Sequence, residues 1–307
     1  MEQGSQTFSF LIGEDDVEER VDKFLAKELC DLSRSYIQKL LKEDRVLLFG
    51  KPVKANYKLK EEDEINFTIP PMKELAVEAE DIPLNILYED EDLIFINKPK
   101  DMVVHPCAGR YSGTLVNGLL YHCKEELSGI NGVLRPGIVH RIDKDTTGVL
   151  VICKNDKAHH SVAEQLKVHS ITRKYRAIVH GIIKEDGTVD APIGRSPKDR
   201  KKMAINEKNG KRAVTHYRVL EHLKGKYTYI ECQLETGRTH QIRVHMASLH
   251  HPLLGDATYG PAANPFHLEG QCLHAMVLGL KHPSTGEYIE CEAALPAYFE
   301  EMLRKLR

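Results

Sequence analysis

The stretch GIVHRIDKDTTGVLVICK, residues 137–154, places a charged cluster directly before an apolar segment. The segment VLVIC is rich in β-branched residues, which is typical of a buried strand. A carboxylate at the edge of a core has its pKa raised by burial and lowered by a nearby guanidinium. If Asp143 reacts as an anion, we therefore expect it to have an arginine partner. The cluster consists of His140, Arg141, Asp143, Lys144 and Asp145.

A second polar cluster, LETGRTHQIRVHMA at residues 234–247, offers such a partner. If QIRVH is extended or begins a helix, the donors of this cluster lie near one another. These donors are Arg238, His240, Arg243 and His245. Each of these residues alone is more often structural than functional, because ion-pair networks also collect charges. Two such clusters, each beside an apolar segment, favour a functional site.

Further strands are predicted around this centre. The segments LIFI (93–96), KYRAIV (174–179) and TYIECQL (228–234) have the composition of strands. The clearest helices are predicted over 158–169 and 297–306. Because strands dominate without regular alternation with helices, we expect an α+β fold with a mixed or antiparallel sheet.

The N-terminal part is predicted to form a separate small domain. Apolar residues keep helical spacing from Val21 to Leu29 and again from Ile37 to Leu41, after a cap at Ser33. Strand-like segments follow, including VLLF and EINFTI. We expect a domain over 1–72 with its core at about 15–70, an acidic linker over 73–84 and a main domain over 85–307.

The charge is unevenly distributed. The chain of 307 residues has a net charge of -2, but eight acids and no Lys or Arg lie between Glu74 and Asp92, and without them the charge is +6. From Lys198 to Arg212 seven bases stand against two acids. This loop is suited to binding phosphates, although a solvated charged loop explains it equally well.

Several classes of protein are disfavoured by the sequence. Seven scattered cysteines without a C-x-x-C pair suggest neither a disulfide framework nor a zinc site. No apolar run reaches eighteen residues and the N-terminus does not read as a signal peptide, so we expect a cytoplasmic protein. A glycine-rich nucleotide-binding loop is also absent from the sequence.

The string VHRIDKDTTG resembles the signature of the RluA/RluD branch of pseudouridine synthases. Other stretches resemble motifs of this family in the same order: INKPKDMVVHP (96–106), RKYRAIVHG (173–181), LETGRTHQIRVHMA (234–247), GDATYG (255–260) and LHAMVL (273–278). In the N-terminal part, RVDKFL (20–25) and SRSYIQKLLKEDRV (33–46) resemble the small RNA-binding domain named after a ribosomal protein. That order of domains is typical of RluD-type enzymes.

The resemblance implies an RNA pseudouridine synthase, an isomerase that flips a uridine out of structured RNA and rejoins its base through carbon five. It implies large-subunit ribosomal RNA as substrate, with transfer RNA or a silent RNA-binding protein as alternatives. No cofactor or metal is expected, and we expect a monomer. Asp143 is the implied catalytic carboxylate, Tyr175 the stacking residue that takes the proton, and Arg243 the partner of Asp143.

Further residues are expected to contact the RNA. By resemblance, Arg141 fills the gap left by the flipped nucleotide. The other expected contacts in the main domain are His140, Arg238 and Lys98. In the N-terminal domain, basic residues on the helix pair and the small sheet are candidates for phosphate contacts, including Arg20, Arg34 and Lys51.

The sequence departs from the family at four turn positions. Asp101 and His250 stand where the family usually has glycine, and Asp44 and Phe49 lie where the accessory domain usually has glycine and asparagine. Aspartate and histidine tolerate a left-handed backbone better than most residues. These departures leave the expected catalytic positions intact.

Two other classes of enzyme fit part of the sequence. Sixteen histidines invite a metallohydrolase, but His240 and His245 are five apart, which suits neither a helix face nor a strand face. Asp143 and Asp145 would share a face if they lay on a strand, as paired carboxylates of a glycosidase do. The absence of tryptophan weakens that alternative, because sugar pockets rely on large aromatic platforms.

Overall fold

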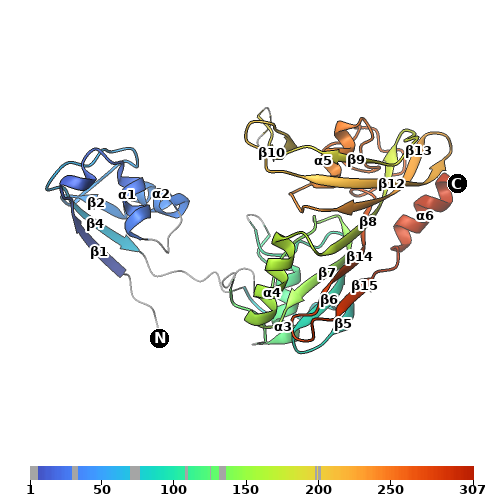
Figure 1. Ribbon diagram of the computed structural model, residues 1–307, viewed down its shortest axis with the longest axis horizontal. Coiled ribbons are helices and arrows are strands. Elements are labelled where there is room, and N and C mark those ends of the chain that lie inside the picture. Colours follow the sequence, from blue (N-terminus) through green and yellow to red (C-terminus); the bar gives the residue numbers. More distant parts are fainter. Residues whose placement is uncertain are drawn as a thin grey trace. The chain divides into compact units, whose positions relative to one another are not determined.

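The computed structural model describes residues 6–29, 34–69, 77–107, 110–124, 126–130, 136–197, 199 and 202–307. The chain divides into two compact units, Met1–Glu74 and Leu75–Arg307 (Figure 1). Within the described residues, no helix is long and apolar enough to cross a membrane. Each unit has its own hydrophobic core, so each is considered separately.

The N-terminal unit packs two helices against a small sheet. The helices α1 (Val21–Glu28) and α2 (Arg34–Lys42) bury Val21, Phe24, Leu25, Ile37 and Leu40, which are the residues whose spacing predicted them. The sheet has the order β1-β4-β2-β3. Its strands are β1 (Gln6–Leu11), β2 (Val46–Leu48), β3 (Lys51–Pro52) and β4 (Glu64–Ile69), and a short 3-10 helix spans Glu14–Asp16. The predicted cap at Ser33 lies outside the described residues.

Strand β1 was not predicted. It pairs antiparallel with β4, so that Phe8 lies opposite Phe67 and Phe10 opposite Ile65. Phe8 and Phe10 pack against the core of this unit, with the ring of Phe10 edge-on to Phe24. The alternation in QTFSFL carries the signal of a strand, but a partner almost sixty residues away is invisible in a local pattern.

The main unit is built on a mixed sheet with the order β5-β6-β7-β14-β8-β13-β12-β9, in which β15 also pairs with β14 (Figure 1). Only β7 and β14 run parallel among the described strands. The strands are β5 (Ile86–Glu89), β6 (Leu93–Lys98), β7 (Thr147–Cys153), β8 (Thr172–His180), β9 (Gly187–Asp190), β12 (Val214–Leu223), β13 (Tyr227–Leu234), β14 (Leu273–Lys281) and β15 (Tyr288–Glu292). The predicted α+β class with a mixed sheet is confirmed.

Helices cover this sheet. They are α3 (Leu115–Cys123), α4 (Asp156–Lys167), α5 (Gln241–Ser248) and α6 (Ala297–Leu306). Figure 1 shows α3 and α4 beside β5 to β7, and α5 beside β9 and β12. The predicted helices over 158–169 and 297–306 correspond to α4 and α6. The side chain of Asn155 caps α4 by accepting a hydrogen bond from the amide of Ala158.

The described residues of the expected acidic linker, 77–84, lie against the main unit. Asn117 on α3 accepts from the amide of Glu80 and donates its side-chain amide to the carbonyl of Glu78. Val77 and Leu84 pack against the largest core cluster. These contacts explain why the second unit begins at Leu75, ahead of the predicted start of the main domain.

β7 and β14 pair in parallel at the start of β7, directly after the charged cluster. His274 and Ala275 on β14 lie opposite Thr147 and Gly148 on β7. Gly148 has a φ of 109°, and a Cβ there would stand 2.1 Å from the carbonyl oxygen of Ala275, so glycine is required for this approach. Ala275 also lies opposite Tyr175 on β8. Because β14 pairs with both β7 and β8, the residues before β7 lie near those on β8.

The four expected left-handed positions are confirmed. Asp44, Asp101 and His250 have φ values of 55°, 62° and 63°, and Phe49 has a φ of 46°. Phe49 and Gly50 form the turn between β2 and β3. A bulky aromatic residue in this conformation is strained, whereas the aspartates and the histidine tolerate it better.

Candidate active site

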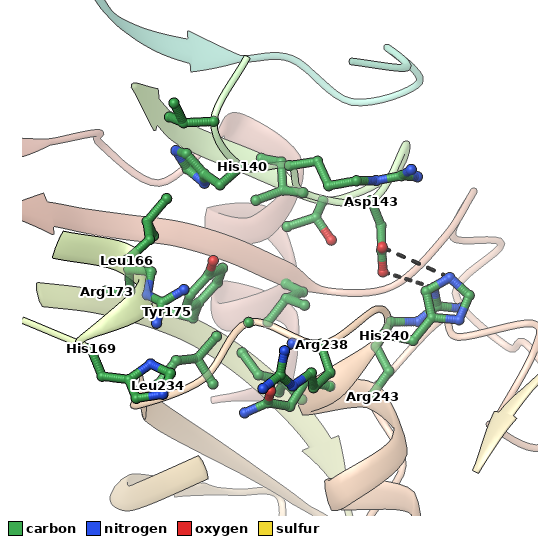
Figure 2. A pocket seen from close by; sticks show the side chains of 18 of the residues that line it. His140, Asp143, Leu166, His169, Arg173, Tyr175, Leu234, Arg238, His240 and Arg243 are labelled. Carbon is green, nitrogen blue, oxygen red and sulfur yellow. Dashed lines mark hydrogen bonds and ion pairs between the residues drawn. The ribbon is translucent and has the colours of Figure 1, made fainter. Parts of the chain in front are cut away.

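A cavity of 610 Å³ lies where the charged cluster, α4, β8 and the start of α5 meet. That volume is within the range of typical ligand pockets. Asp143, Tyr175 and Arg243 all line it, together with Arg141, His140 and Arg238. The residues that the sequence singled out in two separate clusters thus contribute to one cavity. Figure 2 shows the Asp143 carboxylate pointing toward His240 and Arg243.

Asp143 and Arg243 form a direct ion pair. Arg243 Nη1 donates to Asp143 Oδ2 at 2.9 Å, and the two side chains are 8% and 19% exposed. Asp143 lies in the loop before β7, whereas Arg243 is in the first turn of α5. The expected arginine partner of Asp143 is therefore present. The contact is a charge-assisted hydrogen bond between a guanidinium and a carboxylate.

Arg243 is itself held by a second carboxylate. Its Nε and Nη2 donate to the two oxygens of Asp256 at 2.7 and 2.9 Å, in a bidentate pair. The Asp256 side chain is fully buried and also accepts from the amides of Thr258 and Tyr259. Although burial opposes it, Arg243 and these amides lower the pKa of Asp256. The buried carboxylate therefore fixes the direction of the guanidinium.

Tyr175 lies on β8 with 8% of its surface exposed. Its neighbours across the sheet are Cys232 on β13 and Ala275 on β14. Burial raises the pKa of its phenol, with the Arg173 guanidinium acting against that shift and Asp143 adding to it. Tyr175 is therefore protonated at neutral pH when the cavity holds no RNA.

Arg173 lies two residues before Tyr175, on the same face of β8. Its Nη2 donates to the carbonyl of Glu235 at 2.7 Å, and its buried Nε has no hydrogen-bond partner within the described part of the chain. A Cβ on Gly237 would stand 2.7 Å from Nη1, so Gly237 leaves room for this guanidinium. Arg173 places a positive charge at the wall of the cavity, and no carboxylate among the described residues forms an ion pair with it.

His140 and Arg141 lie on the loop that carries Asp143. Nε2 of His140 accepts the amide hydrogen of Val151 at 3.1 Å, and burial together with Arg173 lowers the pKa of His140 to about 3. His140 is therefore a neutral side chain that anchors the loop to β7. Arg141 is exposed, with Nη1 3.5 Å from Nε2 of His105.

Lys98 does not face the cavity. Its side chain is fully buried, and Nζ donates to the carbonyls of Pro99, Met102 and Lys144 at 2.7, 2.9 and 2.9 Å. Burial lowers its pKa to about 7. The predicted contact between Lys98 and RNA is therefore wrong: the ammonium group ties the loop after β6 to the residue next to Asp143.

The three basic residues of the N-terminal unit that were expected to contact RNA have different surroundings. Arg20 is partly exposed and pairs with buried Asp22, with Nε and Nη2 at 3.0 and 3.1 Å from its two oxygens. Lys51 is exposed on β3. The side chain of Arg34 lies outside the described part of the structure. No described contact distinguishes these residues as RNA ligands.

Three residues contribute to the site in ways that the sequence did not predict. Asp256 and Tyr259 lie in GDATYG, which was quoted only for its resemblance, and His240 was treated only as one donor among several. Asp256 follows the apolar pair Leu253-Leu254 after a single glycine, which was the local hint that it is buried. A buried acid needs a partner for its charge. Its distance from Arg243 in the sequence, thirteen residues, follows no helix or strand period.

The structure also bears on the alternative enzymes. Asp143 and Asp145 precede β7 and lie in a loop, so the shared strand face assumed for a glycosidase does not exist. His245 is buried, and its ring nitrogens lie 2.9 Å from Thr215 Oγ1 and 3.0 Å from the carbonyl of Ala191. His240 and His245 therefore have different environments.

The chain is similar to known proteins in both of its parts. Residues 92–248 match the family described as RNA pseudouridylate synthase, and residues 19–65 match the S4 domain. An uncharacterized RNA pseudouridine synthase of Bacillus subtilis, YlyB, is 54% identical over 295 residues, which span 96% of each chain. Ribosomal large subunit pseudouridine synthase D of Zymomonas mobilis is 47% identical over 300 residues, covering 94% of this chain and 93% of that protein.

A solved structure supports the same relationship. The structure of human RNA pseudouridylate synthase domain containing 1 superimposes with a TM-score of 0.55 and 27% identity. The match covers 77% of this chain and 98% of the human one.

Proposed function

The chain belongs to the RNA pseudouridylate synthase family, and we propose that it isomerises uridines of large-subunit ribosomal RNA with Asp143 as the carboxylate that starts the reaction. The observation that carries this proposal is the Asp143 carboxylate, paired with Arg243 at the wall of a cavity that Tyr175 also lines. The substrate follows from relatives named for the large ribosomal subunit. Transfer RNA is the alternative substrate.

The reaction is an isomerisation, so no atom is gained or lost overall. The bond between ribose C1′ and uracil N1 breaks, a bond between C1′ and C5 forms, C5 loses a proton and N1 gains one. Asp143 can attack the ring or the sugar, or it can stabilise the positive charge that develops as the first bond breaks. Either role needs an ionised carboxylate close to the nucleotide.

Arg243 supplies the conditions for that role. It donates a charge-assisted hydrogen bond to Asp143, and its bidentate pair with Asp256 fixes the direction from which it donates. Because Asp143 Oδ2 is held, the carboxylate cannot rotate freely, which is how an enzyme keeps a reacting group oriented.

Tyr175 is proposed to stack on the flipped uracil and to take the proton from C5. Stacking of a base on an aromatic side chain contributes about 1–3 kcal/mol, which offsets much of the cost of unstacking that base. As the phenol starts out protonated, it must release its own proton to water as it takes the C5 proton, and water supplies the proton that N1 gains. The neighbouring Arg173 guanidinium favours the phenolate that this exchange passes through.

The remaining contacts concern the binding of folded RNA. Exposed Arg141, on the loop beside Asp143, is proposed to fill the gap left by the flipped nucleotide, and Arg238 to contact a nearby phosphate. The S4 domain is proposed to bind RNA through basic residues that include Arg20, Arg34 and Lys51. Ribosomal RNA as substrate implies a cytoplasmic enzyme, and we expect it to act as a monomer.

Mapping of pseudouridines in total RNA tests the proposal. Four strains are compared: the parent, a deletion strain, and the deletion strain carrying either the wild-type gene or Asp143→Asn. We expect one or more large-subunit positions to disappear on deletion and to return only with the wild type. Positions lost only from transfer RNA would replace the proposed substrate, and an unchanged map would refute the proposal.

A further inference from the structure

His240 stands beside the carboxylate oxygen of Asp143 that Arg243 does not hold, and it has no role in the mechanism above. Its Nε2 lies 3.8 Å from Asp143 Oδ1, whereas Arg243 holds Oδ2 at 2.9 Å (Figure 2). The two oxygens of the carboxylate therefore face different partners. A separation of 3.8 Å is slightly too long for a hydrogen bond, so a shift of less than 1 Å completes the contact.

The backbone of His240 is held in an uncommon conformation. His240 precedes α5 with a φ of 57° and a ψ of 22°, in the left-handed region, and its side chain makes no capping hydrogen bond to the helix. Such backbone strain clusters at functional sites, although histidine tolerates this region better than most residues. The conformation directs the imidazole away from the helix end, so it is free to face Asp143.

Tyr259 fixes the orientation of the imidazole. The two rings meet edge to face, with centroids 5.7 Å apart and an angle of 78° between their planes. The Tyr259 hydroxyl lies 2.9 Å from His240 Nδ1. The Arg243 guanidinium stacks on the face of the same tyrosine, with 5.1 Å between the guanidinium carbon and the ring centroid. Tyr259 thus touches both partners of Asp143.

The hydrogen bonds around Tyr259 also select a tautomer of His240. The amide of Met203 donates to the Tyr259 hydroxyl at 3.0 Å, so this oxygen is an acceptor there and its own hydrogen remains for His240 Nδ1. Nδ1 is then the bare nitrogen and Nε2 carries the proton, because the partner of one ring nitrogen determines the state of the other. The Nε2 hydrogen points at a carboxylate, which favours the same tautomer.

The imidazole in this position is neutral. Burial lowers the pKa of His240, Asp143 opposes that shift, and Arg243 adds to it. A neutral donor orients Asp143 Oδ1 without adding a second positive charge to the carboxylate. The negative charge needed for attack or for stabilising the developing cation is therefore retained.

Met203 belongs to a hairpin formed by β10 (Ile193–Arg195) and β11 (Met203–Ile205). We call these two strands, together with the residues that follow β11 as far as Arg212, the basic hairpin. The Nζ of Lys202 donates to the carbonyl of Thr258 at 2.9 Å, next to Tyr259. Met203, Ile205 and Tyr259 pack against one small core with Val244 of α5. Lys198, Arg200 and Lys201 of the basic loop lie outside the described residues.

We infer that His240 is a positioning residue for Asp143, with Tyr259 and the basic hairpin fixing the tautomer that donates from Nε2 to Oδ1. This inference rests on the proposed role of Asp143. The chain of contacts runs from the Met203 amide through the Tyr259 hydroxyl and His240 to Asp143. Formation of the hairpin is thereby linked to the orientation of the reacting carboxylate.

The tautomer can be measured without RNA. Nitrogen-15 chemical shifts of the histidine rings are recorded in the full-length protein at neutral pH, with the His240 signals assigned by their loss in His240→Gln. We expect Nε2 protonated and Nδ1 bare in the wild type, and a changed Nδ1 shift in Tyr259→Phe, where that nitrogen loses its hydrogen-bond donor. A wild-type ring protonated on Nδ1, or identical shifts in Tyr259→Phe, would overturn the inference.

Two substitutions of His240 test the effect on catalysis. The amide nitrogen of glutamine can occupy the position of Nε2, whereas asparagine suits the left-handed backbone but is too short. With His240→Asn we expect a single-turnover rate about 10²-fold lower with unchanged RNA affinity, and with His240→Gln partial recovery. Thermal unfolding of both variants controls for misfolding.

The outcomes separate the inference from the proposed function. Wild-type activity in His240→Asn, or an equal loss in both variants, would show that His240 does not position Asp143, even if the tautomer is as expected. If the wild type itself converts no uridine in ribosomal RNA, the proposed function fails. The nitrogen-15 experiment would still decide whether the Tyr259 contact selects the tautomer.

Discussion

Arg243 donates to Asp143 at 2.9 Å through Nη1, and the rest of its guanidinium is held by a second, fully buried carboxylate. One cation thus joins the reacting group to the interior of the protein. Its carboxylate partners raise the pKa of Arg243, although burial alone would lower it. The position of Asp143 therefore depends on residues that do not touch the nucleotide.

Replacing Asp256 should affect both stability and rate. Asp256→Ala leaves the buried part of Arg243 without its partner, so we expect the free energy of unfolding to fall by about 3–5 kcal/mol. Asp256→Asn keeps the size but loses the charge, and we expect a single-turnover rate about 10²-fold lower. Urea unfolding and single-turnover kinetics measure these effects. Asp190→Asn, which removes an exposed pair with Arg212, is the control and should change stability by less than about 1 kcal/mol.

The buried ammonium group of Lys98 gives a second prediction. Lys98→Met leaves three carbonyls without their donor, and each unsatisfied buried group costs roughly 1–3 kcal/mol. We expect a loss of about 3 kcal/mol or more in urea unfolding and no change in the salt dependence of RNA binding. Weaker, less salt-dependent binding with unchanged stability would instead return Lys98 to the RNA interface.

Stability should fall in mild acid because of His140. The unfolded imidazole binds a proton below about pH 6.5, whereas the folded one binds it only near pH 3. Between these values the unfolded state carries more protons, so this group makes the free energy of unfolding rise with pH. Urea unfolding at pH 5 and pH 7.5 should show a smaller difference in His140→Gln than in the wild type. An equal difference would mean that His140 does not contribute.

The basic hairpin gives a prediction about salt. Lys208 and Lys211 are exposed, whereas Lys202 is tied to Thr258. If both exposed lysines contact phosphates, their replacement by glutamine should reduce the slope of log affinity against log salt by about 0.7–0.9 for each contact. Lys305→Gln, at an exposed position of α6, is the matched control. An unchanged slope in the double variant would exclude these lysines from the interface.

Much of this fold could be predicted because its signals are local. The apolar run before Cys153 and the alternation from Thr228 to Leu234 each report burial on a strand, and both strands are present. The chemistry of a buried carboxylate predicted an arginine partner for Asp143, and the family resemblance pointed to Arg243, one hundred positions away.

What could not be predicted depends on how distant segments meet. Lys98 was expected to contact the RNA. Lysines are seldom fully buried, and only the folded loops show three carbonyls converging on its ammonium group. The contacts of Tyr259 with Met203 and His240 could not be predicted for the same reason. Their spacing in the sequence follows no helix or strand period.

The release of tritium from carbon five of uridine tests the central role of Asp143 most directly. Large-subunit ribosomal RNA labelled at that carbon is mixed with excess enzyme, and RNA binding is measured in parallel. We predict rapid release with the wild type and none with Asp143→Asn, which should bind the RNA as tightly. Release by Asp143→Asn at the wild-type rate would contradict the account.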